Sequence, residues 1–247
     1  HSRWSSSEVV LLAELSKREK VYHVFQQISQ TYDRANGRIS LGMESRWKDC
    51  LIEAVCEQAA KGSRVLDVCS GTGDIAISLA AHRPDLKVTG LDFSPAMLDV
   101  ARKKGAPLAN VTWQEGDAMK LPFEDNTFSA ACISFGLRNT SDYLRVLQEM
   151  TRVVVPGGWV YCLDSFVPDS LVIRPFYSVY FRYVMPFLGG GFRHRQEYTW
   201  LWQSTQDFLR KKELLDLFGQ AGLIDRQMKS RLFGACVLHK GKKPAVE

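Results

Sequence analysis

The stretch Val65-Leu66-Asp67-Val68-Cys69-Ser70-Gly71-Thr72-Gly73-Asp74 decides the fold of this 247-residue chain. An apolar run ends in Gly-x-Gly and passes at once into the helix-like sequence Ile75 to Ala81. A strand that turns through glycines into a helix builds a nucleotide pocket, because glycine accepts positive φ and lets a ligand approach the backbone closely. We therefore favour ligand binding over a plain tight turn between strand and helix.

The glycine pattern alone leaves two kinds of ligand open. Gly71-Thr-Gly73-Asp-Ile-Ala76 also fits the dinucleotide fingerprint with alanine in its last place. Asp67, however, lies inside the apolar run, where a pyrophosphate would gain nothing from a carboxylate. A ligand with a cationic amino-acid end would gain from it. The position of Asp67 thus favours such a ligand over a nicotinamide dinucleotide.

A second acid closes the next expected strand. Asp92 lies about 20 residues after the glycines, where a ribose-binding carboxylate is expected. Ser94 follows as an N-cap and Pro95 as the first residue of a helix that ends at Lys104. The alternative is that Asp92 only helps to cap this helix. Because Ser94 already fills that role, we favour the ribose.

Strand-like and helix-like segments alternate from Arg64 to Phe166, which predicts an α/β, doubly wound, mostly parallel sheet. Helices are also expected at Tyr143–Arg152, before a Pro156-Gly157-Gly158 turn, and at Lys211–Ala221, with Gly222 as its C-cap. The expected strands are Arg64–Val68, Lys87–Leu91, Val111–Glu115, Phe128–Ser134, Trp159–Phe166, Ile224–Lys229 and Phe233–His239.

Strings spread along the chain resemble class I S-adenosylmethionine-dependent methyltransferases, and among them the ubiquinone/menaquinone biosynthesis C-methyltransferases. Ile133-Ser-Phe-Gly-Leu-Arg-Asn139 is the most specific, whereas Gly-x-Gly and Pro-Gly-Gly are generic to the class. The other matching strings are Tyr32-Asp-x-x-Asn36, Trp47-Lys48, Asp67 to Asp74, Leu91 to Leu98, Leu121 to Phe128 and Arg152 to Gly158. The resemblance runs from about Val21 to Lys240, and Glu197-Tyr198-x-Trp200-Leu201 looks closest to the demethylmenaquinone branch.

The resemblance implies a Rossmann-like sheet of seven strands with an antiparallel last strand, and helices within Glu8 to Cys56 that cover the cofactor. It implies S-adenosyl-L-methionine as cofactor and methylation of a ring carbon of a prenylated quinol, from demethylmenaquinol to menaquinol. The alternatives are a methyltransferase for another small acceptor at O, N or C, an NAD-dependent oxidoreductase, and a non-catalytic membrane-associated protein. Asp67 argues against the oxidoreductase, and the intact cofactor acids argue against the non-catalytic protein.

The resemblance also implies the residues of the cofactor site. Asp117 replaces an asparagine common in relatives but keeps adenine contact open, and Phe93 belongs to the same cofactor set. By position, the implied contacts are Asp67, Gly71, Thr72 and Gly73 at the methionine moiety, Asp92 at the ribose, Asp117 and the Ala118 backbone at the adenine, and Ser134 near the methyl-bearing end.

The acceptor chemistry points to three further residues. A quinol ring becomes nucleophilic when a hydroxyl loses its proton, so the protein needs a base or a cation that stabilises the phenolate. Arg138 follows the Phe128–Ser134 strand and is predicted to do electrostatic and orienting work, since guanidinium is a poor base. The alternative is a salt bridge to a lid carboxylate. Asn139 is expected to bond a quinol oxygen or fix the arginine, and Tyr32 to close on the methionine end or simply to pack.

Composition is that of an ordinary globular protein, with 45% hydrophobic and 24% charged residues. We expect a loose N-terminus over residues 1–20 and one domain over 21–247, with a cofactor-binding core at 57–166 and a lid at 170–208. Six cysteines without a Cys-x-x-Cys pair, and histidines without metal-ligand spacing, predict reduced thiols, a cytoplasmic location and no metal.

The lid region has an unusual composition. Residues 171–202 hold ten of the 27 aromatic residues, and residues 171–212 carry seven Lys or Arg against two acids. Arg174 and Arg182 argue against a membrane-spanning helix. Either the aromatics pack into the core, or the segment covers an apolar substrate and touches anionic lipid at the inner membrane face, and both can hold. A lipophilic quinol is the expected partner, a homodimer stays open, and nucleic acid is disfavoured because large aliphatics separate the basic residues.

Overall fold

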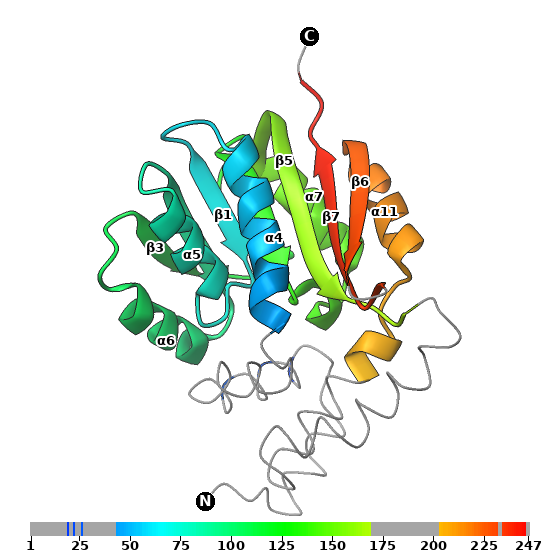
Figure 1. Ribbon diagram of the computed structural model, residues 1–247, viewed down its shortest axis with the longest axis horizontal. Helices are drawn as coiled ribbons and strands as arrows, with labels where there is room; N and C mark the ends of the chain where they lie inside the picture. The colour runs from blue at the N-terminus through cyan, green and yellow to red at the C-terminus, as the bar shows by residue number, and fades with distance from the viewer. Residues whose placement is uncertain are drawn as a thin grey trace, which may run out of the picture.

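The computed structural model describes residues 43–168, 203–231 and 234–245, together with Glu19, Tyr22 and Gln26. Seven strands form one sheet in the order β3-β2-β1-β4-β5-β7-β6 (Figure 1). Neighbours from β3 to β5 pair in parallel, and β7 pairs antiparallel with both β5 and β6. The predicted seven-stranded sheet with an antiparallel last strand is confirmed. The strands are β1 (Arg64–Val68), β2 (Lys87–Asp92), β3 (Val111–Glu115), β4 (Phe128–Ser134), β5 (Val154–Ser165), β6 (Ile224–Arg231) and β7 (Cys236–Lys242).

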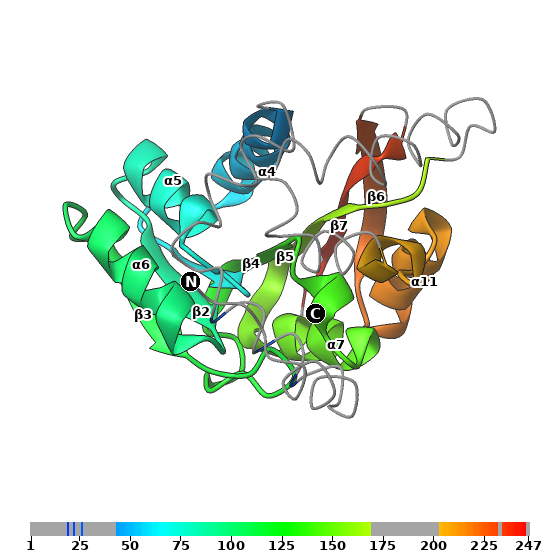
Figure 2. The same cartoon turned by 90° about the horizontal axis from the view of Figure 1, so that it is seen from below.

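Helices cover both faces of the sheet (Figures 1 and 2). The helices α4 (Met43–Gln58), α5 (Asp74–His82) and α6 (Pro95–Gly105) lie on one face, and α7 (Tyr143–Val153) and α11 (Lys211–Gln220) lie on the other. A single 3-10 turn, η1 (Leu137–Asn139), follows β4. Ser94 caps α6, as predicted, because its side chain accepts a hydrogen bond from the Met97 amide at 3.3 Å.

The core forms two apolar clusters, one on each face of the sheet. Alternate residues of β1 supply both: Leu66 and Val68 pack toward α7, and Val65 packs toward α4 and α5. Strands that are buried on both faces are rich in apolar residues, which is why β1 and β4 are mostly apolar, with Asp67 as the buried exception in β1. Cys132 is a buried free thiol of the second cluster.

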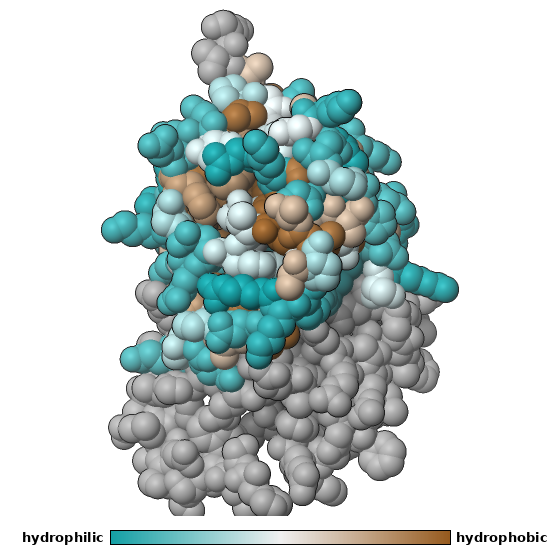
Figure 3. All heavy atoms as spheres, turned by 90° about the vertical axis from the view of Figure 1, so that its left-hand side faces the viewer, coloured by the Kyte–Doolittle hydropathy of each residue, from teal (hydrophilic) through white to brown (hydrophobic). Residues whose placement is uncertain are grey.

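The sheet ends at β3 on one side and at β6 on the other. Figure 3 shows the β3 side, where polar residues surround a small apolar area. Thr112, Gln114 and Glu115 of β3 are exposed, while Val111 and Trp113 are partly buried. A short edge strand with exposed polar side chains is poorly suited to pairing with another sheet.

Four strands differ from the prediction, β2 and β6 only in that they end one and two residues later. β5 begins at Val154 rather than at Trp159, so it contains the Pro156-Gly157-Gly158 segment that was expected to turn before the strand. The pairing with β4 shifts register there, because Phe128 faces Val154 whereas Ala130 faces Trp159. β7 runs from Cys236 to Lys242 instead of Phe233 to His239, which follows from its antiparallel register on β5. Gly222 follows α11 with a φ of +87°, as expected of a C-cap glycine.

Several predictions fall outside the described residues: the helices before residue 43, Tyr32, and the aromatic insertion at 171–202. Tyr22 is described, and its ring centroid lies 5.6 Å from that of Phe93. In the described ranges no helix has the length and apolar character needed to cross a membrane.

Candidate functional site

A pocket lies at the carboxyl ends of the parallel strands, the end seen in Figure 2. It holds about 790 Å³ of space, counted with the part open to solvent. It is built from the segments that follow β1, β2, β3 and β4. From β1 the chain adds β2 and β3 toward one edge of the sheet, whereas β4 lies on the other side of β1. Ligands of open α/β sheets bind at such a switch point.

The glycine turn after β1 supplies the first wall. Gly71 has a φ of +53° and lines the pocket, and a Cβ at this position would meet no atom within 4 Å. Gly73 differs, because a Cβ there would lie 2.4 Å from the Trp113 ring. Gly71 therefore gives a ligand access to the backbone, whereas Gly73 allows α5 to approach the Trp113 side chain closely.

Asp92 lines the pocket and also holds two loops together. It is 5% exposed, and its carboxylate accepts hydrogen bonds from the backbone amides of Gly71 at 2.8 Å and Ser94 at 2.9 Å. Burial raises its pKa to about 6. Asp92 thus supports the glycine turn and the start of α6 while it lines the pocket, and its contact with a ribose stays a prediction.

Asp67 lies behind the pocket wall rather than in it. Its side chain is 1% exposed, and its Oδ2 accepts a hydrogen bond from the Ala76 amide at 3.1 Å. Burial raises its pKa to about 8. Thr72 and Gly73 are also absent from the pocket lining. Three of the four residues expected at the methionine end therefore support the wall from behind, and Gly71 alone of the four reaches the cavity.

The wall after β3 carries the predicted adenine residues. Asp117 and Ala118 line the pocket together with Gly116 and Met119. Asp117 Oδ1 accepts a hydrogen bond from the Met119 amide at 2.9 Å, which folds the segment back on itself. The Asp117 carboxylate is therefore fixed at the pocket by its own loop.

The end of β4 is tightly packed against the glycine turn. Phe135 has a φ of +54°, and a Cβ on Gly136 would lie 2.6 Å from the Cys69 Cβ. Ser134, which also lines the pocket, has a buried hydroxyl for which the described part of the chain offers no hydrogen-bond partner. Buried polar atoms are normally satisfied, so this hydroxyl fits a site that receives a polar group of a ligand.

Arg138 is buried beside the pocket instead of lining it. It is 5% exposed and forms an ion pair through Nη1 with Asp164 Oδ1 on β5. Its guanidinium carbon also lies 5.6 Å from the Phe135 ring centroid. Asp164 belongs to the sheet, and the expected alternative of a salt bridge to a lid carboxylate stays a prediction, because residues 169–202 lie outside the described ranges. Asn139 does line the pocket, and its amide nitrogen donates to the Phe135 carbonyl at 3.3 Å.

Several lining residues were not among the predicted site residues. Seven of these eight lie within two residues of a predicted residue, so the position of a loop after a strand end is the signal that indicates them. Met97 lies instead on α6, inside the matching string Leu91 to Leu98. These additional residues are Cys69, Met97, Gly116, Met119, Phe135, Gly136, Thr140 and Ser141.

The lining suits a nucleoside with a polar tail. Phe93, Met97 and Met119 give apolar surface for a flat base, and the Asp92 carboxylate can accept hydrogen bonds from ribose hydroxyls. The open Gly71 backbone and the Ser134 hydroxyl supply further polar groups. These features fit S-adenosylmethionine.

The sheet order and the position of this pocket define a class I S-adenosylmethionine-dependent methyltransferase fold. An S-adenosylmethionine-dependent methyltransferase of Thermotoga maritima superposes with a TM-score of 0.63 at 20% identity, covering 90% of this chain and 99% of that one. The [4+2]-cyclase SpnF gives a TM-score of 0.62 at 20% identity, covering 80% and 81%. Because a cyclase shares the fold, the fold alone does not fix the reaction.

The whole-chain comparison narrows the class to one family. Residues 13–243 match the ubiE/COQ5 methyltransferase family, and the chain belongs to that family. Demethylmenaquinone methyltransferase of Staphylococcus aureus (strain JH9) is 44% identical over 230 residues, which cover 92% of this chain and 95% of the relative. The predictions of a methyltransferase and of S-adenosylmethionine as its cofactor are confirmed.

Proposed function

We propose that this protein transfers a methyl group from S-adenosylmethionine to a ring carbon of demethylmenaquinol, which yields menaquinol. The observation that carries the proposal is the 44% identity, over nearly the full length of both chains, to an enzyme named demethylmenaquinone methyltransferase. The pocket supports it, because Asn139, from the string most specific to the quinone branch, lies in the lining.

In this proposal each wall of the pocket binds a different part of the cofactor. The cofactor, when bound, supplies a methyl group already activated on a sulfonium, so the protein has to bind, orient and exclude water. Asp92 accepts the ribose hydroxyls, and Asp117 with the Ala118 backbone addresses the adenine. Gly71 receives the methionine end. Asp67, which lies behind this wall, favours the positive charge of that end electrostatically. Phe93 covers the ribose side, where Tyr22 packs against it.

The acceptor side is formed by the segment after β4. Ser134 lies at the methyl-bearing end, and Asn139 hydrogen-bonds a quinol oxygen so that the ring carbon faces the methyl group. Arg138 acts from behind this segment: its charge, held by Asp164 and stacked near Phe135, stabilises the phenolate that forms when the quinol loses a proton.

We also propose that the protein contacts the membrane surface and forms a homodimer. A prenylated quinol resides in lipid, and the basic, aromatic composition of residues 171–202 suits an interfacial lid within the proposed segment 170–208. We expect the protein to bind anionic vesicles in a salt-sensitive way. Replacing Arg182, Arg193 and Arg195 by glutamine should reduce vesicle binding and leave activity on a short-chain quinol nearly unchanged. Equal loss of both activities would identify the segment as a core lid. Analytical ultracentrifugation measures the mass of the protein in solution and so distinguishes a dimer from a monomer.

One experiment tests the main proposal. Labelled S-adenosylmethionine is supplied together with demethylmenaquinol, a polyprenyl benzoquinol, or a catechol, and the methylated product is identified by mass spectrometry. We expect C-methylation of the naphthoquinol to be fastest. O-methylation of the catechol as the fastest reaction would favour the alternative of another small acceptor. Calorimetry with S-adenosylhomocysteine and NAD provides the control, since only the former should bind.

A further inference from the structure

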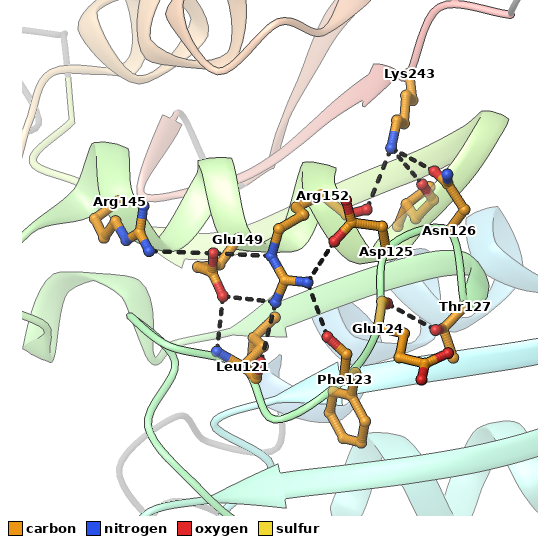
Figure 4. A network of polar contacts seen from close by, with 11 residues as sticks. Leu121, Phe123, Glu124, Asp125, Asn126, Thr127, Arg145, Glu149, Arg152 and Lys243 are labelled. Atoms are coloured by element: carbon orange, nitrogen blue, oxygen red, sulfur yellow. Dashed lines mark hydrogen bonds and ion pairs between the residues drawn. The ribbon is translucent and has the colours of Figure 1, made fainter.

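The adenine wall of the pocket is held from outside by helix α7 (Figure 4). Three carbonyls of the segment after β3, at every second residue, accept hydrogen bonds from two arginines of this helix. The Met119 carbonyl accepts from Arg145 Nε at 3.1 Å. The carbonyls of Leu121 and Phe123 accept from Arg152 at 3.0 Å and 2.8 Å. None of these helix side chains lines the pocket.

Glu149 lies between the two arginines and completes the contact. Its Oε2 accepts hydrogen bonds from the Leu121 amide and from Arg152 Nη2, both at 2.8 Å. Its Oε1 accepts from Arg152 Nε at 3.0 Å and lies 3.3 Å from Arg145 Nη2. The Glu149 side chain is 5% exposed, and the hydrogen bond from Arg152 lowers its pKa. Both backbone groups of Leu121 are therefore fixed by one ion pair, in which Glu149 is buried and Arg152 is 31% exposed.

The spacing of these residues separates two faces of α7. Arg145, Glu149 and Arg152 follow one another at i, i+4 and i+7, which places them on one side of a helix. Val146 and Met150 are fully buried in the core cluster on that side of the sheet. The same helix therefore packs into the core with one stripe and holds the pocket segment with another.

The contact continues into the pocket through Met119. Its carbonyl receives Arg145, and its amide donates to the Asp117 carboxylate at 2.9 Å. Its sulfur accepts a hydrogen bond from the Ser141 hydroxyl at 3.2 Å, just before the Asp142 N-cap of α7. Arg145 is thus one residue removed from the carboxylate that faces the adenine position.

We propose that Arg145, Glu149 and Arg152 are positioning residues that set the base selectivity of the cofactor pocket. They hold the Asp117 to Leu121 backbone so that Asp117 and Ala118 read the adenine amino group. The inference rests on the proposed function, because it requires that this wall receives the adenine. It differs from a general effect on stability, which would weaken every ligand of the pocket equally.

The test compares two ligands by calorimetry: S-adenosylhomocysteine and S-inosylhomocysteine, which carries a carbonyl in place of the adenine amino group. We expect the wild type to bind the adenine compound roughly tenfold or more tightly, since the replacement removes a hydrogen bond to a charged group. In Arg145→Ala this ratio should fall at least about threefold. Arg145 is the first choice because its side chain is 51% exposed, so the variant retains the buried Glu149 pair with Arg152.

Two further variants make the result decisive. Glu149→Gln keeps one acceptor for the Leu121 amide but loses the charge, and it should lower the ratio as well. Arg226→Ala is the matched control, because Arg226 is an arginine that donates to a backbone carbonyl, that of Leu215 at 3.1 Å, away from the pocket. The control should leave the ratio unchanged.

The outcomes separate the inference from the function it rests on. If the wild type prefers the adenine ligand and both Arg145→Ala and Glu149→Gln keep the wild-type ratio, the inference is wrong and the proposed function stands. A wild type that binds both ligands equally also overturns it, since there is no selectivity to set. If the wild type binds neither ligand, the proposed function fails and the inference fails with it.

Discussion

Replacement of Asp67 by asparagine should make the cofactor-free protein more stable and should weaken cofactor binding. Asp67 is 1% exposed, and burial raises its pKa from 3.8 to about 8. The folded protein therefore holds a proton that the unfolded chain releases above pH 3.8. Because the unfolded state binds fewer protons across this range, the free energy of unfolding falls as pH rises from about 4 to about 8.

The magnitude follows from the width of that window. Each pH unit between the two pKa values is worth about 1.36 kcal/mol, so the buried carboxyl costs about 4 kcal/mol of stability at pH 7 and about 1.5 kcal/mol at pH 5. Asparagine removes this term but weakens the hydrogen bond from the Ala76 amide and buries an amide group, which together cost about 1–2 kcal/mol. We expect Asp67→Asn to gain about 2–3 kcal/mol at pH 7 and almost nothing at pH 5.

Urea unfolding of both proteins at pH 5, 6, 7 and 8, without cofactor, measures the difference. Calorimetry with S-adenosylhomocysteine at pH 8 measures cofactor affinity. The affinity should fall in Asp67→Asn, because the ligand carries a cationic ammonium group that the carboxylate attracts. A difference in unfolding free energy that stays constant from pH 5 to pH 8 would refute the reasoning, whatever its size. A stabilised variant with wild-type affinity would remove Asp67 from the cofactor site but leave the pKa argument intact.

Other residues give shorter tests. Asp92→Ala should weaken S-adenosylhomocysteine binding by roughly 1.5–3 kcal/mol in calorimetry, and unchanged affinity would remove it from the ribose site. Gly73→Ala should lower the unfolding free energy by about 1–3 kcal/mol in urea, because the new methyl meets Trp113 at a φ of +88°. Arg138→Ala should lower kcat with cofactor Kd near wild type, and should also destabilise by about 3–5 kcal/mol since Asp164 is left buried without its partner. Arg138→Lys should restore kcat poorly, because an ammonium lacks the planar fork.

The sequence predicted those parts of the fold that local patterns control. β1, β3 and β4 have the predicted bounds, because each is followed within a few residues by a glycine that marks a turn. The bounds of β5 and β7 depend instead on how two distant segments pair. Ser165 faces Cys236, and nothing within either segment indicates that register. Strand pairing is the level at which single-sequence reasoning loses information.

The site shows the same division between local and distant causes. Residues at or just after the end of a strand, such as Asp92 and Asp117, were predicted, and they line the pocket. Asp67 was expected at the ligand because of its type, but a side chain inside a strand points into a layer of packing, and here that layer lies behind the glycine turn. The partner of Arg138 is 26 residues further along the chain, on β5, so only the three-dimensional pairing reveals it.

Carboxylates at the strand ends explain how the pocket keeps its shape. After β2, Asp92 accepts the amides of Gly71 and Ser94, and after β3, Asp117 accepts the amide of Met119. At the end of β5, Asp164 accepts the amide of Ser165 at 2.9 Å. Asp92 and Asp117 each fix a loop in this way, and such a contact is strongest when the acid is charged. Burial nevertheless raises the pKa of both Asp92 and Asp164.

The charge of Asp92 therefore links pocket order to pH. Below its pKa of about 6 the protonated carboxyl is a weaker acceptor for the Gly71 amide, and the glycine turn loses part of its support. A bound ribose donates hydroxyl hydrogens to the same carboxylate, which favours the charged form and lowers its pKa. By linkage, the cofactor must bind more tightly as pH rises from 5 to 7 and must release protons in that range. The proton release, measured calorimetrically in buffers of different ionisation enthalpy, is expected to fall in Asp92→Asn, and an unchanged release would place the titrating group elsewhere.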